Sequence, residues 1–181
     1  MPASTATERI DDNQAFKRYA DGAVVVRTER LPWMPWAAPG TYCKVLHMDM
    51  SHAKTTVLIK VDPGTTLGVH KHLGDAEAYM LDGDFTYEHG SAGAGDYLCE
   101  KGGIRHIPVT GDRGLRLFGV NYGSLHGEDE AGNLLGVIDN EYYYTMAVAN
   151  DCHDHLVQAT TREHVASTEA ARLKAAAGGA A

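Results

Sequence analysis

Residues 63–72 read PGTTLGVHKH and residues 102–108 read GGIRHIP, and these two stretches decide the fold. In the first stretch, His70 and His72 are two positions apart. On an extended strand, side chains at i and i+2 point to the same side, so both imidazoles reach the same space. Two adjacent imidazoles inside a barrel would repel each other when charged and lack partners when neutral, and a metal ion resolves both problems. The alternative is a pair of partly exposed surface histidines, because H-x-H alone is a weak motif.

Short runs with high β propensity extend on both sides of these stretches, from residue 41 to residue 122. The turn signals between them have the spacing of an all-β sandwich or barrel. These signals are Pro63-Gly64, Asp82-Gly83, residues 90–95, Gly102-Gly103 and residues 111–114. A further tight turn at 128–133 precedes an apolar run at 134–138, which predicts a last hairpin. We therefore expect an all-β strand meander without β-α-β units.

The chain is expected to divide into four segments around one β domain. Residues 23–28 (AVVVRT) read as a first strand, so residues 1–22 form an N-terminal arm and residues 23–140 form the barrel. Apolar residues beyond position 142 recur at mixed three-to-four spacing and Asp151 offers a cap, which predicts a helical segment over 141–167. Residues 168–181 end in Ala and Gly, and we expect a disordered tail.

The totals of the chain limit its partners. Its 181 residues suit one domain that buries a core without disulfides or metal. The net charge of -8 argues against nucleic-acid binding, which needs many Lys and Arg contacts to phosphate, and favours a small neutral or weakly charged ligand. Cys43, Cys99 and Cys152 form no C-x-x-C motif, so neither a disulfide framework nor a thiolate site is expected. The polar start and the lack of a long apolar run predict a cytoplasmic protein that does not enter membranes.

Taken together, these motifs resemble the cupin signature. Residues 63–83 correspond to its first half, which ends in a glycine turn after the histidine strand, and residues 94–106 correspond to its second half. The resemblance covers about residues 41–122 and implies a cupin double-stranded β-helix, a jelly-roll barrel whose two sheets enclose a pocket, with a short helical C-terminal segment. It also implies that His70, His72 and His106 bind one divalent transition metal ion per chain.

The carboxylate that most cupins add to their histidines is displaced in this sequence. Ala76 occupies its position, and Glu77 is one residue out of step. A slip of one residue on a strand turns the side chain to the opposite face. We therefore interpret Glu77 as a solvated carboxylate or one that supports a ligand from outside, rather than as a ligand itself.

Two groups of cupins resemble particular stretches. Residues 85–90 and 94–96 resemble anti-sigma-factor cupin domains, whereas residues 129–136 resemble a hairpin of the 2,4'-dihydroxyacetophenone dioxygenases and acetylacetone-cleaving cupins. In the dihydroxyacetophenone enzyme, a glutamate from the next strand assists three histidines on a ferrous ion. The resemblance implies that Glu88 is a fourth ligand or a catalytic residue, and the alternative is an ordinary carboxylate at a strand end. His89, beside it, is a candidate acid or base.

The function follows from the metal. Three neutral imidazoles leave open positions on a divalent ion and suit iron, zinc, nickel or copper. The resemblance favours Fe(II) and implies a dioxygenase that takes O2 and a small hydroxyketone, β-diketone or aromatic ketone and cleaves a C–C bond. Two alternatives stay open, namely a non-catalytic sensor that binds zinc or a small ligand and a metal-dependent isomerase or lyase. We expect a homodimer, because cupin sheets commonly pair.

Aromatic and apolar residues near the motifs are expected to pack the barrel. Trp33 and Trp36 lie in a proline-rich loop and either close a core edge, which we favour, or line a ligand mouth. Several strand residues are candidates for the walls of a ligand pocket. These are Leu58, Met80, Phe85, Tyr87 and Phe118.

The remaining polar residues are given structural roles. Arg105 and Arg116 lie on the motif strands, and we favour salt bridges with Glu88 or Glu100 over a role in holding an anionic substrate. His153 and His155 repeat the H-x-H spacing, but they fall in a segment expected to be helical or irregular. In a helix, residues at i and i+2 do not face one side, so we expect both histidines to be solvated.

Overall fold

The computed structural model describes residues 11, 13–20 and 22–156. Short strands dominate it and one α-helix follows them, which confirms the predicted all-β class. In chain order the elements are β1 (Phe16–Arg18), β2 (Val24–Val26), the 3-10 helix η1 (Thr28–Arg30), β3 (Met34–Pro35), β4 (Thr41–Asp49), β5 (Lys54–Val61), β6 (His70–His72), β7 (Ala76–Tyr87), β8 (Gly90–Gly93), β9 (Tyr97–Glu100), β10 (Arg105–His106), β11 (Val109–Tyr122), β12 (Leu125–Glu128), β13 (Leu134–Ile138) and α1 (Asn140–Ala149).

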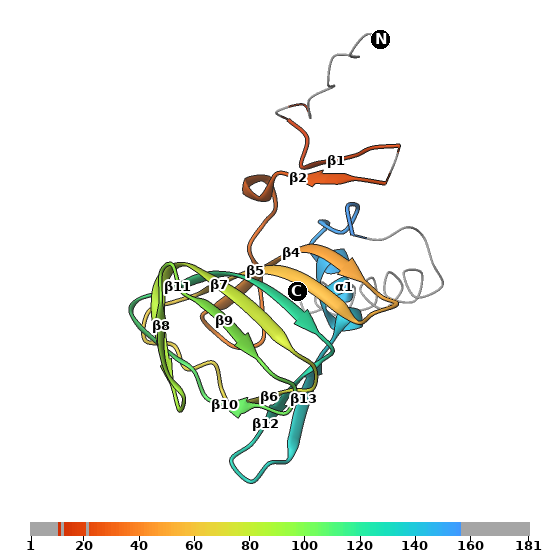
Figure 1. The fold of residues 1–181 in the computed structure, drawn as a ribbon. Helices are drawn as coiled ribbons and strands as arrows, with labels where there is room; N and C mark the ends of the chain where they lie inside the picture. The colour runs from red at the N-terminus through yellow and green to blue at the C-terminus, as the bar shows by residue number, and fades with distance from the viewer. Residues whose placement is uncertain (1–10, 12, 21, 157–181) are drawn as a thin grey trace, which may run out of the picture.

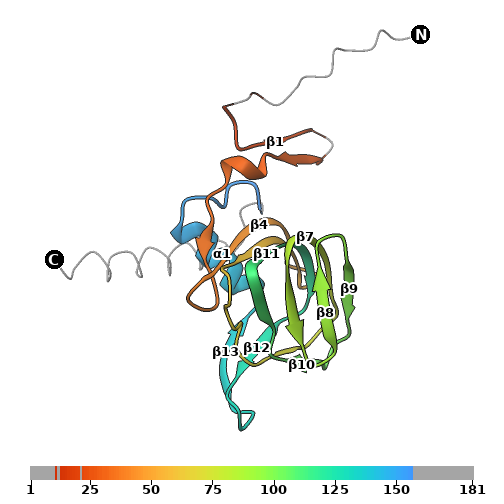
Figure 2. The ribbon, with the colours of Figure 1, turned by 90° about the vertical axis from the view of Figure 1, so that its left-hand side faces the viewer.

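Two antiparallel sheets form the barrel. The larger has the order β3-β4-β5-β11-β7-β8, and β9 also pairs with β7. The smaller has the order β10-β6-β12-β13, so the predicted hairpin that ends in residues 134–138 is present. Figure 1 shows the larger sheet arching over the smaller one, and Figure 2 shows the same two layers from the side. This is the predicted jelly-roll architecture, in which residues between the layers are shielded from water.

The long strands β7 and β11 replace turns that the sequence predicts. Asp82-Gly83 and residues 111–114 read as turns, but both strands continue through them, with a shift of register between Thr110 and Leu115. Gly83 has a φ of +72°, and a Cβ atom there would collide with the carbonyl group of Gly114. Both glycines therefore allow the backbones of β7 and β11 to approach closely at an irregularity in the sheet. The strands bend there but do not end.

Helix α1 packs on the core side of the larger sheet. Its N-cap is Asp139, whose side chain accepts a hydrogen bond of 2.9 Å from the backbone N–H of Tyr142. The predicted cap, Asp151, lies beyond the end of the helix, where its φ is +54°. Buried residues of α1 join the main core with residues of β3 and β4. They are Tyr143, Tyr144 and Ala147 on the helix, and Met34, Cys43 and Val45 on the strands.

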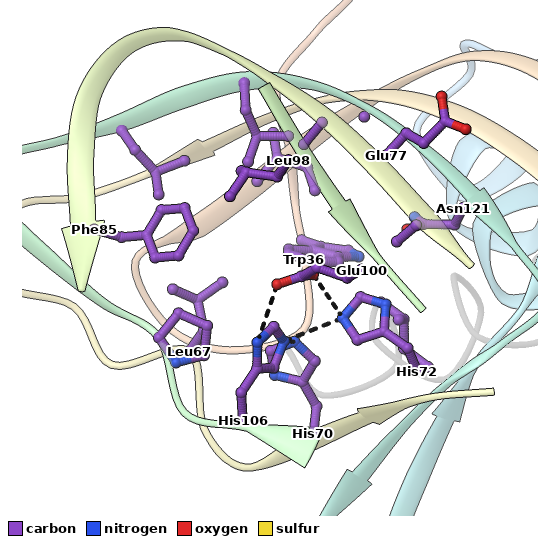
Figure 3. Close-up of a pocket in the computed structure, with 18 residues that line it drawn as sticks. Trp36, Leu67, His70, His72, Glu77, Phe85, Leu98, Glu100, His106 and Asn121 are labelled. Carbon is purple, nitrogen blue, oxygen red and sulfur yellow. Dashed lines mark hydrogen bonds and ion pairs between the residues drawn. The ribbon is translucent and has the colours of Figure 1, made fainter. Parts of the chain in front are cut away.

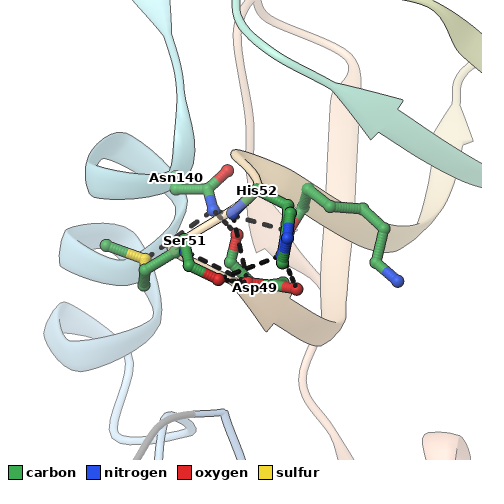
Figure 4. Close-up of polar contacts among 6 residues, drawn as sticks. Asp49, Ser51, His52 and Asn140 are labelled. Carbon is green, nitrogen blue, oxygen red and sulfur yellow. Dashed lines mark hydrogen bonds and ion pairs between the residues drawn. The ribbon is translucent and has the colours of Figure 1, made fainter.

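Asn140 ties the start of α1 to the turn between β4 and β5 (Figure 4). Its side chain donates to the carbonyl oxygen of Asp49 at 3.1 Å and accepts from the hydroxyl group of Thr55 at 2.7 Å. In the same turn, the hydroxyl oxygen of Ser51 and the carboxylate of Asp49 lie 3.0 and 2.7 Å from Nδ1 of His52. Because both contacts use one ring nitrogen, these residues do not form the relay of a nucleophilic triad.

Strands β1 and β2 form a separate hairpin outside the two barrel sheets (Figure 1). Residues 23–28, predicted to begin the barrel, therefore include a strand that pairs with the N-terminal arm instead. Arg18 donates a hydrogen bond of 3.2 Å to the carbonyl oxygen of His155, which joins the hairpin to the segment after α1.

The predicted C-terminal segments are only partly described. The structure places α1 at Asn140–Ala149 and a turn-rich segment after it, up to residue 156. The rest of the helical segment predicted over 141–167, and the tail at 168–181, lie outside the described residues. Among the described residues, no helix has both the length and the apolar character that a membrane span requires.

Candidate metal centre

Three histidines come together on the smaller sheet. Strand β6 carries His70 and His72 two positions apart, and β10 lies antiparallel to it with His106 opposite His70. The Nε2 atom of His106 lies 2.7 Å from Nε2 of His70 and 3.1 Å from Nε2 of His72. One ligand atom from each of the three residues lies within 4.8 Å of the other two. The structure thus gathers the three residues that the sequence predicts as metal ligands (Figure 3).

A carboxylate reaches these histidines from the larger sheet. Glu100 ends β9, which pairs with β7 so that Glu100 lies opposite Ala76. Its Oε2 atom lies 3.4 Å from Nε2 of His72, and its Oε1 atom lies 3.3 Å from Nδ1 of His106 (Figure 3). The usual cupin glutamate would stand at position 76, so here the neighbouring strand supplies the carboxylate.

The sequence prediction did not include Glu100 among the site residues, although a signal for it exists. In β9, Leu98 and Glu100 line the cavity, whereas Tyr97 and Cys99, which alternate with them, are exposed. A carboxylate on the inward face of a half-apolar strand is unusual unless it has a partner. That alternation, followed two residues later by the turn before His106, could have identified it.

Burial keeps His70 and His72 neutral. Burial, with the neighbouring charge of His106, lowers the pKa of His70 to about 4. Burial also lowers the pKa of His72 to about 4, although Glu100 acts in the opposite direction. For Glu100 itself, burial acts to raise the pKa, but the hydrogen bond and charges of the histidines outweigh it, so this pKa lies below its ordinary value. At neutral pH, two neutral imidazoles therefore lie beside an ionised carboxylate.

This pattern of protons and lone pairs fits a cation. Nδ1 of His70 lies 3.1 Å from the carbonyl oxygen of Gly68, which can only accept, so Nε2 of His70 presents a lone pair to the other histidines. Nδ1 of His72 is buried and completes no hydrogen bond with any described residue, and the Glu100 carboxylate can only accept. Converging lone pairs repel each other unless a cation lies between them. Three imidazoles and a carboxylate suit iron, zinc or nickel, so these residues can hold the predicted metal ion.

The same four side chains line a small, mainly apolar cavity between the two sheets (Figure 3). Its volume is about 90 Å³, whereas a single water needs roughly 10–15 Å³ by the same measure. A molecule of several heavy atoms therefore fits beside the histidines. The other lining residues are Trp36, Ile59, Leu67, Ala76, Glu77, Ala78, Phe85, Leu98, Pro108, Leu115, Leu117, Gly119, Asn121 and Leu125.

Glu88 and His89 do not belong to this cavity, and their predicted roles are corrected. Both are exposed at the turn between β7 and β8. The Glu88 carboxylate accepts hydrogen bonds of 3.1 and 3.2 Å from the backbone N–H of Ile107. These hydrogen bonds engage the Glu88 carboxylate and stabilise the end of β10. Among the described residues, the carboxylate that contacts the histidines is Glu100.

Glu77 points away from the histidines, as predicted for a residue one position out of step on the strand. Figure 3 shows its carboxylate directed away from the histidines, although its residue borders the cavity. Burial raises the pKa of Tyr97, on the adjacent strand, and the negative charge of Glu77 acts in the same direction. Glu77 therefore lies beside Tyr97 and not beside the metal centre.

The aromatic residues divide between the cavity and other surfaces. Trp36 and Phe85 line the cavity, so the ligand-mouth alternative holds for Trp36. Trp33 instead contacts the Lys44 ammonium group, 4.7 Å from its ring centre. The other predicted wall residues lie elsewhere: Met80 is in the core, Leu58 and Phe118 line a groove on the outer face, and the ring of Tyr87 lies 5.3 Å from that of His106.

The prediction that His155 is solvated is wrong. Its side chain is 4% exposed and its Nε2 atom lies 2.9 Å from the carbonyl oxygen of Val45. The chain after α1 folds back onto β4 and buries this ring. His153 is half-buried, and its ring lies 5.9 Å from that of Tyr144.

Both arginines on the motif strands form ion pairs, as predicted, but their partners are not the predicted Glu88 or Glu100. Nε of Arg105 lies 2.8 Å from the Glu128 carboxylate on β12, and a guanidinium nitrogen of Arg116 lies 3.1 Å from the Asp82 carboxylate on β7. Neither arginine lines the cavity. They join neighbouring strands at the surface and do not hold a ligand in it.

Comparison with known proteins agrees with this architecture. A family model described as the ChrR cupin-like domain matches residues 21–126. No curated protein matches the chain. A solved RmlC-like cupin protein from Ralstonia eutropha JMP134 is 25% identical, with a TM-score of 0.60, over 63% of this chain and 77% of the other.

Two further solved structures have the same fold at lower identity. A putative acetylacetone dioxygenase from Methylibium petroleiphilum PM1 is 20% identical, with a TM-score of 0.61, over 76% of this chain and 95% of its own. An acetylacetone dioxygenase from Acinetobacter johnsonii is 17% identical, with a TM-score of 0.58, over 81% and 93% of the two chains. The family model spans more than half of the chain and includes all three histidines. The chain therefore belongs to the ChrR cupin-like domain family of the cupin superfamily.

Proposed function

We propose that this protein binds a ferrous ion and acts as a dioxygenase that cleaves a C–C bond of a small β-diketone or hydroxyketone. The observation that carries the proposal is the convergence of three histidines and Glu100 at the wall of a small apolar cavity. A purely structural metal site is closed by its ligands, whereas this one borders space that a ligand can fill. Acetylacetone dioxygenases share the fold, so acetylacetone is the first substrate to test.

The residues of the chain would divide the work as follows. A ferrous ion held by His70, His72 and His106 would supply Lewis-acid chemistry toward the ketone and the activation of dioxygen. Neutral His70 and His72 hold such a cation without first losing protons. Ionised Glu100 borders the cavity and is therefore placed to accept the proton that a β-diketone loses when it enolises.

The rest of the cavity excludes water and gives the substrate a route inward. Leu67, Leu98 and Phe85 supply apolar wall, which keeps bulk water from the reacting atoms. A groove of about 350 Å³ lies under the β12–β13 hairpin and shares Trp36, Leu67, His70 and Leu125 with the cavity. These shared residues mark the passage from the surface to the histidines.

A second candidate function is a zinc-binding sensor without catalysis. The observation that favours it is the carboxylate of Glu100, because three imidazoles and one carboxylate can fill all four positions of tetrahedral zinc. Such a site would leave no open position for a ketone and dioxygen. Metal identity and oxygen uptake therefore distinguish the two candidates.

The metal assignment is tested by elemental analysis of the purified protein and of single variants. We expect close to one ion per chain in the wild type, and an empty site in His70→Ala and His106→Ala with the barrel still folded. His52→Ala is the matched control, since this exposed histidine does not line the cavity and should keep full metal occupancy. Full occupancy in both site variants would show that the histidines are not the ligands.

The activity is tested by oxygen uptake of the iron-loaded protein with acetylacetone and with a panel of hydroxyketones. The proposal expects uptake that matches ketone consumption and is lost in His106→Ala. Tightly held zinc with no uptake across the panel would support the sensor. Consumption of a ketone without oxygen uptake would instead indicate an isomerase or lyase.

A further inference from the structure

Two glycines lie beside His70 on the inward face of the smaller sheet. Gly127 on β12 pairs with His70 on β6, and Gly136 on β13 pairs with Gly127. Residues directly opposite each other on antiparallel strands point to the same face, so the three positions form one row across the sheet. His106 on β10 continues the row on the other side of His70. Half of the row therefore carries imidazoles, and the other half carries no side chains.

The backbone conformation explains neither glycine. Neither residue has a positive φ, and a bulge such as the register shift after Gly127 requires glycine only where φ is positive. Beyond its chain neighbours, a Cβ atom at Gly136 would have no atom within 4 Å, and one at Gly127 would lie 3.9 Å from the carbonyl oxygen of Gly136. Glycine is also unfavourable within a strand, because it loses more conformational entropy on folding than other residues. What the two positions share is open space beside His70, and a strand glycine often marks a place that a ligand approaches.

The two glycines line the groove under the β12–β13 hairpin. The volume of this groove is about 350 Å³, against about 90 Å³ for the cavity, and Trp36, Leu67, His70 and Leu125 line both. The groove therefore begins at the histidines and offers more room than the cavity itself. A passage that only admits acetylacetone would not need that much space.

The groove is suited to an uncharged ligand. Leu67 and Leu125 supply apolar wall where it meets the cavity, and Ile138, opposite Leu125 on β13, extends that wall. The Glu128 carboxylate also borders the groove, but Nε of Arg105 lies 2.8 Å from it. No Lys or Arg is among the described residues that line the groove, so an anionic group would lack a counter-charge. An apolar group therefore fits these surroundings best.

We propose that Gly127 and Gly136 form the floor of a subsite for one long apolar arm of the substrate, whose two ketone oxygens face the histidines. The inference rests on the proposed function and narrows its substrate class to β-diketones with one long arm and one short arm. The short arm follows from the rest of the cavity wall, because Phe85, Leu98 and Leu115 line the cavity but not the groove. A second long arm would collide with that wall.

The first test compares ligands that differ only in the length of one arm. The iron-loaded protein is titrated without oxygen, by calorimetry, with pentane-2,4-dione and with nonane-2,4-dione, which is longer at one end only. Burial of each added CH2 group favours binding by about fourfold, but the arm also loses conformational freedom. We therefore expect nonane-2,4-dione to bind the wild type about tenfold more tightly than pentane-2,4-dione.

An isomer separates the groove from general hydrophobicity. Nonane-4,6-dione has the same composition as nonane-2,4-dione, but its apolar carbons are divided equally between two arms. A surface that merely attracts apolar molecules would bind both isomers alike. A groove on one side of the histidines should favour nonane-2,4-dione by about tenfold.

A side chain on the floor should block the groove. Gly136→Leu should remove both preferences while iron content stays at the wild-type level, because this position is two strands away from His70. Gly127→Val fills the same floor nearer to the histidines and should also remove both preferences. Gly93→Leu is the matched control, since this β8 glycine has no positive φ and lines neither the cavity nor the groove, and it should keep both preferences.

Thermal unfolding of the metal-free variants adds a readout of structure. The stability of Gly136→Leu should be equal to that of the wild type or higher, because the new Cβ atom meets open space and a strand glycine is replaced. A lower stability with unchanged ligand preferences would show that Gly136 serves the fold and not a ligand.

Three further results would overturn the subsite. Equal affinity of the wild type for nonane-2,4-dione and pentane-2,4-dione, or for the two nonanedione isomers, would show that the groove holds no arm of the substrate. Preferences that survive both Gly136→Leu and Gly127→Val would place the long arm elsewhere. Failure of all three diketones to bind, with iron retained, would overturn the subsite together with the proposed substrate class, whereas equal binding with oxygen uptake would overturn the subsite alone.

Discussion

The core beneath α1 and the metal centre between the sheets are both largely buried, but they differ in what surrounds their polar groups. In the core, the Asn140 side chain is bonded to Asp49 and Thr55, and the Tyr143 phenol has Trp36 and Asn121 as polar partners. In the metal centre, His72 and His106 are buried and Glu100 is partly buried, and all three side chains border a cavity. Nδ1 of His72 completes no hydrogen bond with a described residue. Burial of paired polar groups therefore marks packing, whereas imidazoles and a carboxylate that converge at a cavity mark a place for a ligand.

The largest effect on stability is expected in the core. Met34 is 1% exposed, so Met34→Ala should lower the free energy of unfolding by about 2–5 kcal/mol, through lost apolar contact and the cavity that remains. Urea unfolding of the metal-free protein measures this. Metal occupancy of the folded fraction should not change. A variant that stays folded but loses its metal would show that the two regions are coupled.

Acid should destabilise the metal-free protein through the histidines of the metal centre. The pKa values of His70 and His72 lie at about 4 in the folded state, below the ordinary value near 6.5. Between pH 6.5 and 4 the unfolded chain therefore binds more protons, so stability falls as the pH falls through this window and levels off below about 4. The loss should be on the order of 2 kcal/mol for each histidine by pH 5. Urea unfolding of His70→Ala/His72→Ala at several pH values should give a flatter profile, and an unchanged slope would contradict the assignment.

The two candidate carboxylates can be separated by one matched pair of variants. Glu100→Gln should weaken metal binding by about 10–100-fold, because it removes the charge beside His72 and His106. Glu88→Gln should leave the affinity within about twofold, since its carboxylate braces the backbone of Ile107. Titration with a competing chelator measures both. Equal losses in the two variants would refute the distinction.

The smallest effect is expected at the helix cap. Asp139→Ala should lower the free energy of unfolding by about 1 kcal/mol, because the backbone N–H of Tyr142 loses its acceptor. Asp151→Asn is the control, and it should change stability by no more than about 0.5 kcal/mol, since Asn tolerates the φ of +54° at this position. Thermal unfolding checks both, and the metal affinity should stay constant in each.

Local rules predict the part of the site that lies within one strand and its partner. The i, i+2 spacing of His70 and His72 places them on one face, and the motif that contains His106 lies on the adjacent strand β10. Glu100 is harder to predict, because it meets the histidines through the register of β9 against β7 in another sheet. That register depends on contacts that are distant in the sequence.

The fold shows the same limit at particular residues. The all-β class follows from short runs between glycines, but Gly83 and Gly114 bend two long strands where turns were expected. His155 was placed on the surface, because periodicity does not show that the chain turns back to Val45 after α1. Both errors concern contacts between residues that are distant in the sequence, which local propensity does not encode.

The pairing of Ala76 with Glu100 also bears on how this site can evolve. The two positions face the same point from neighbouring strands, so an acidic residue at either one can deliver its charge there without a change in the backbone. A lineage could pass through an intermediate with carboxylates on both strands and then discard one of them. Descendants would then share the same coordination chemistry with the acidic residue on different strands, and a search at a single motif position would overlook those that carry it on the other strand.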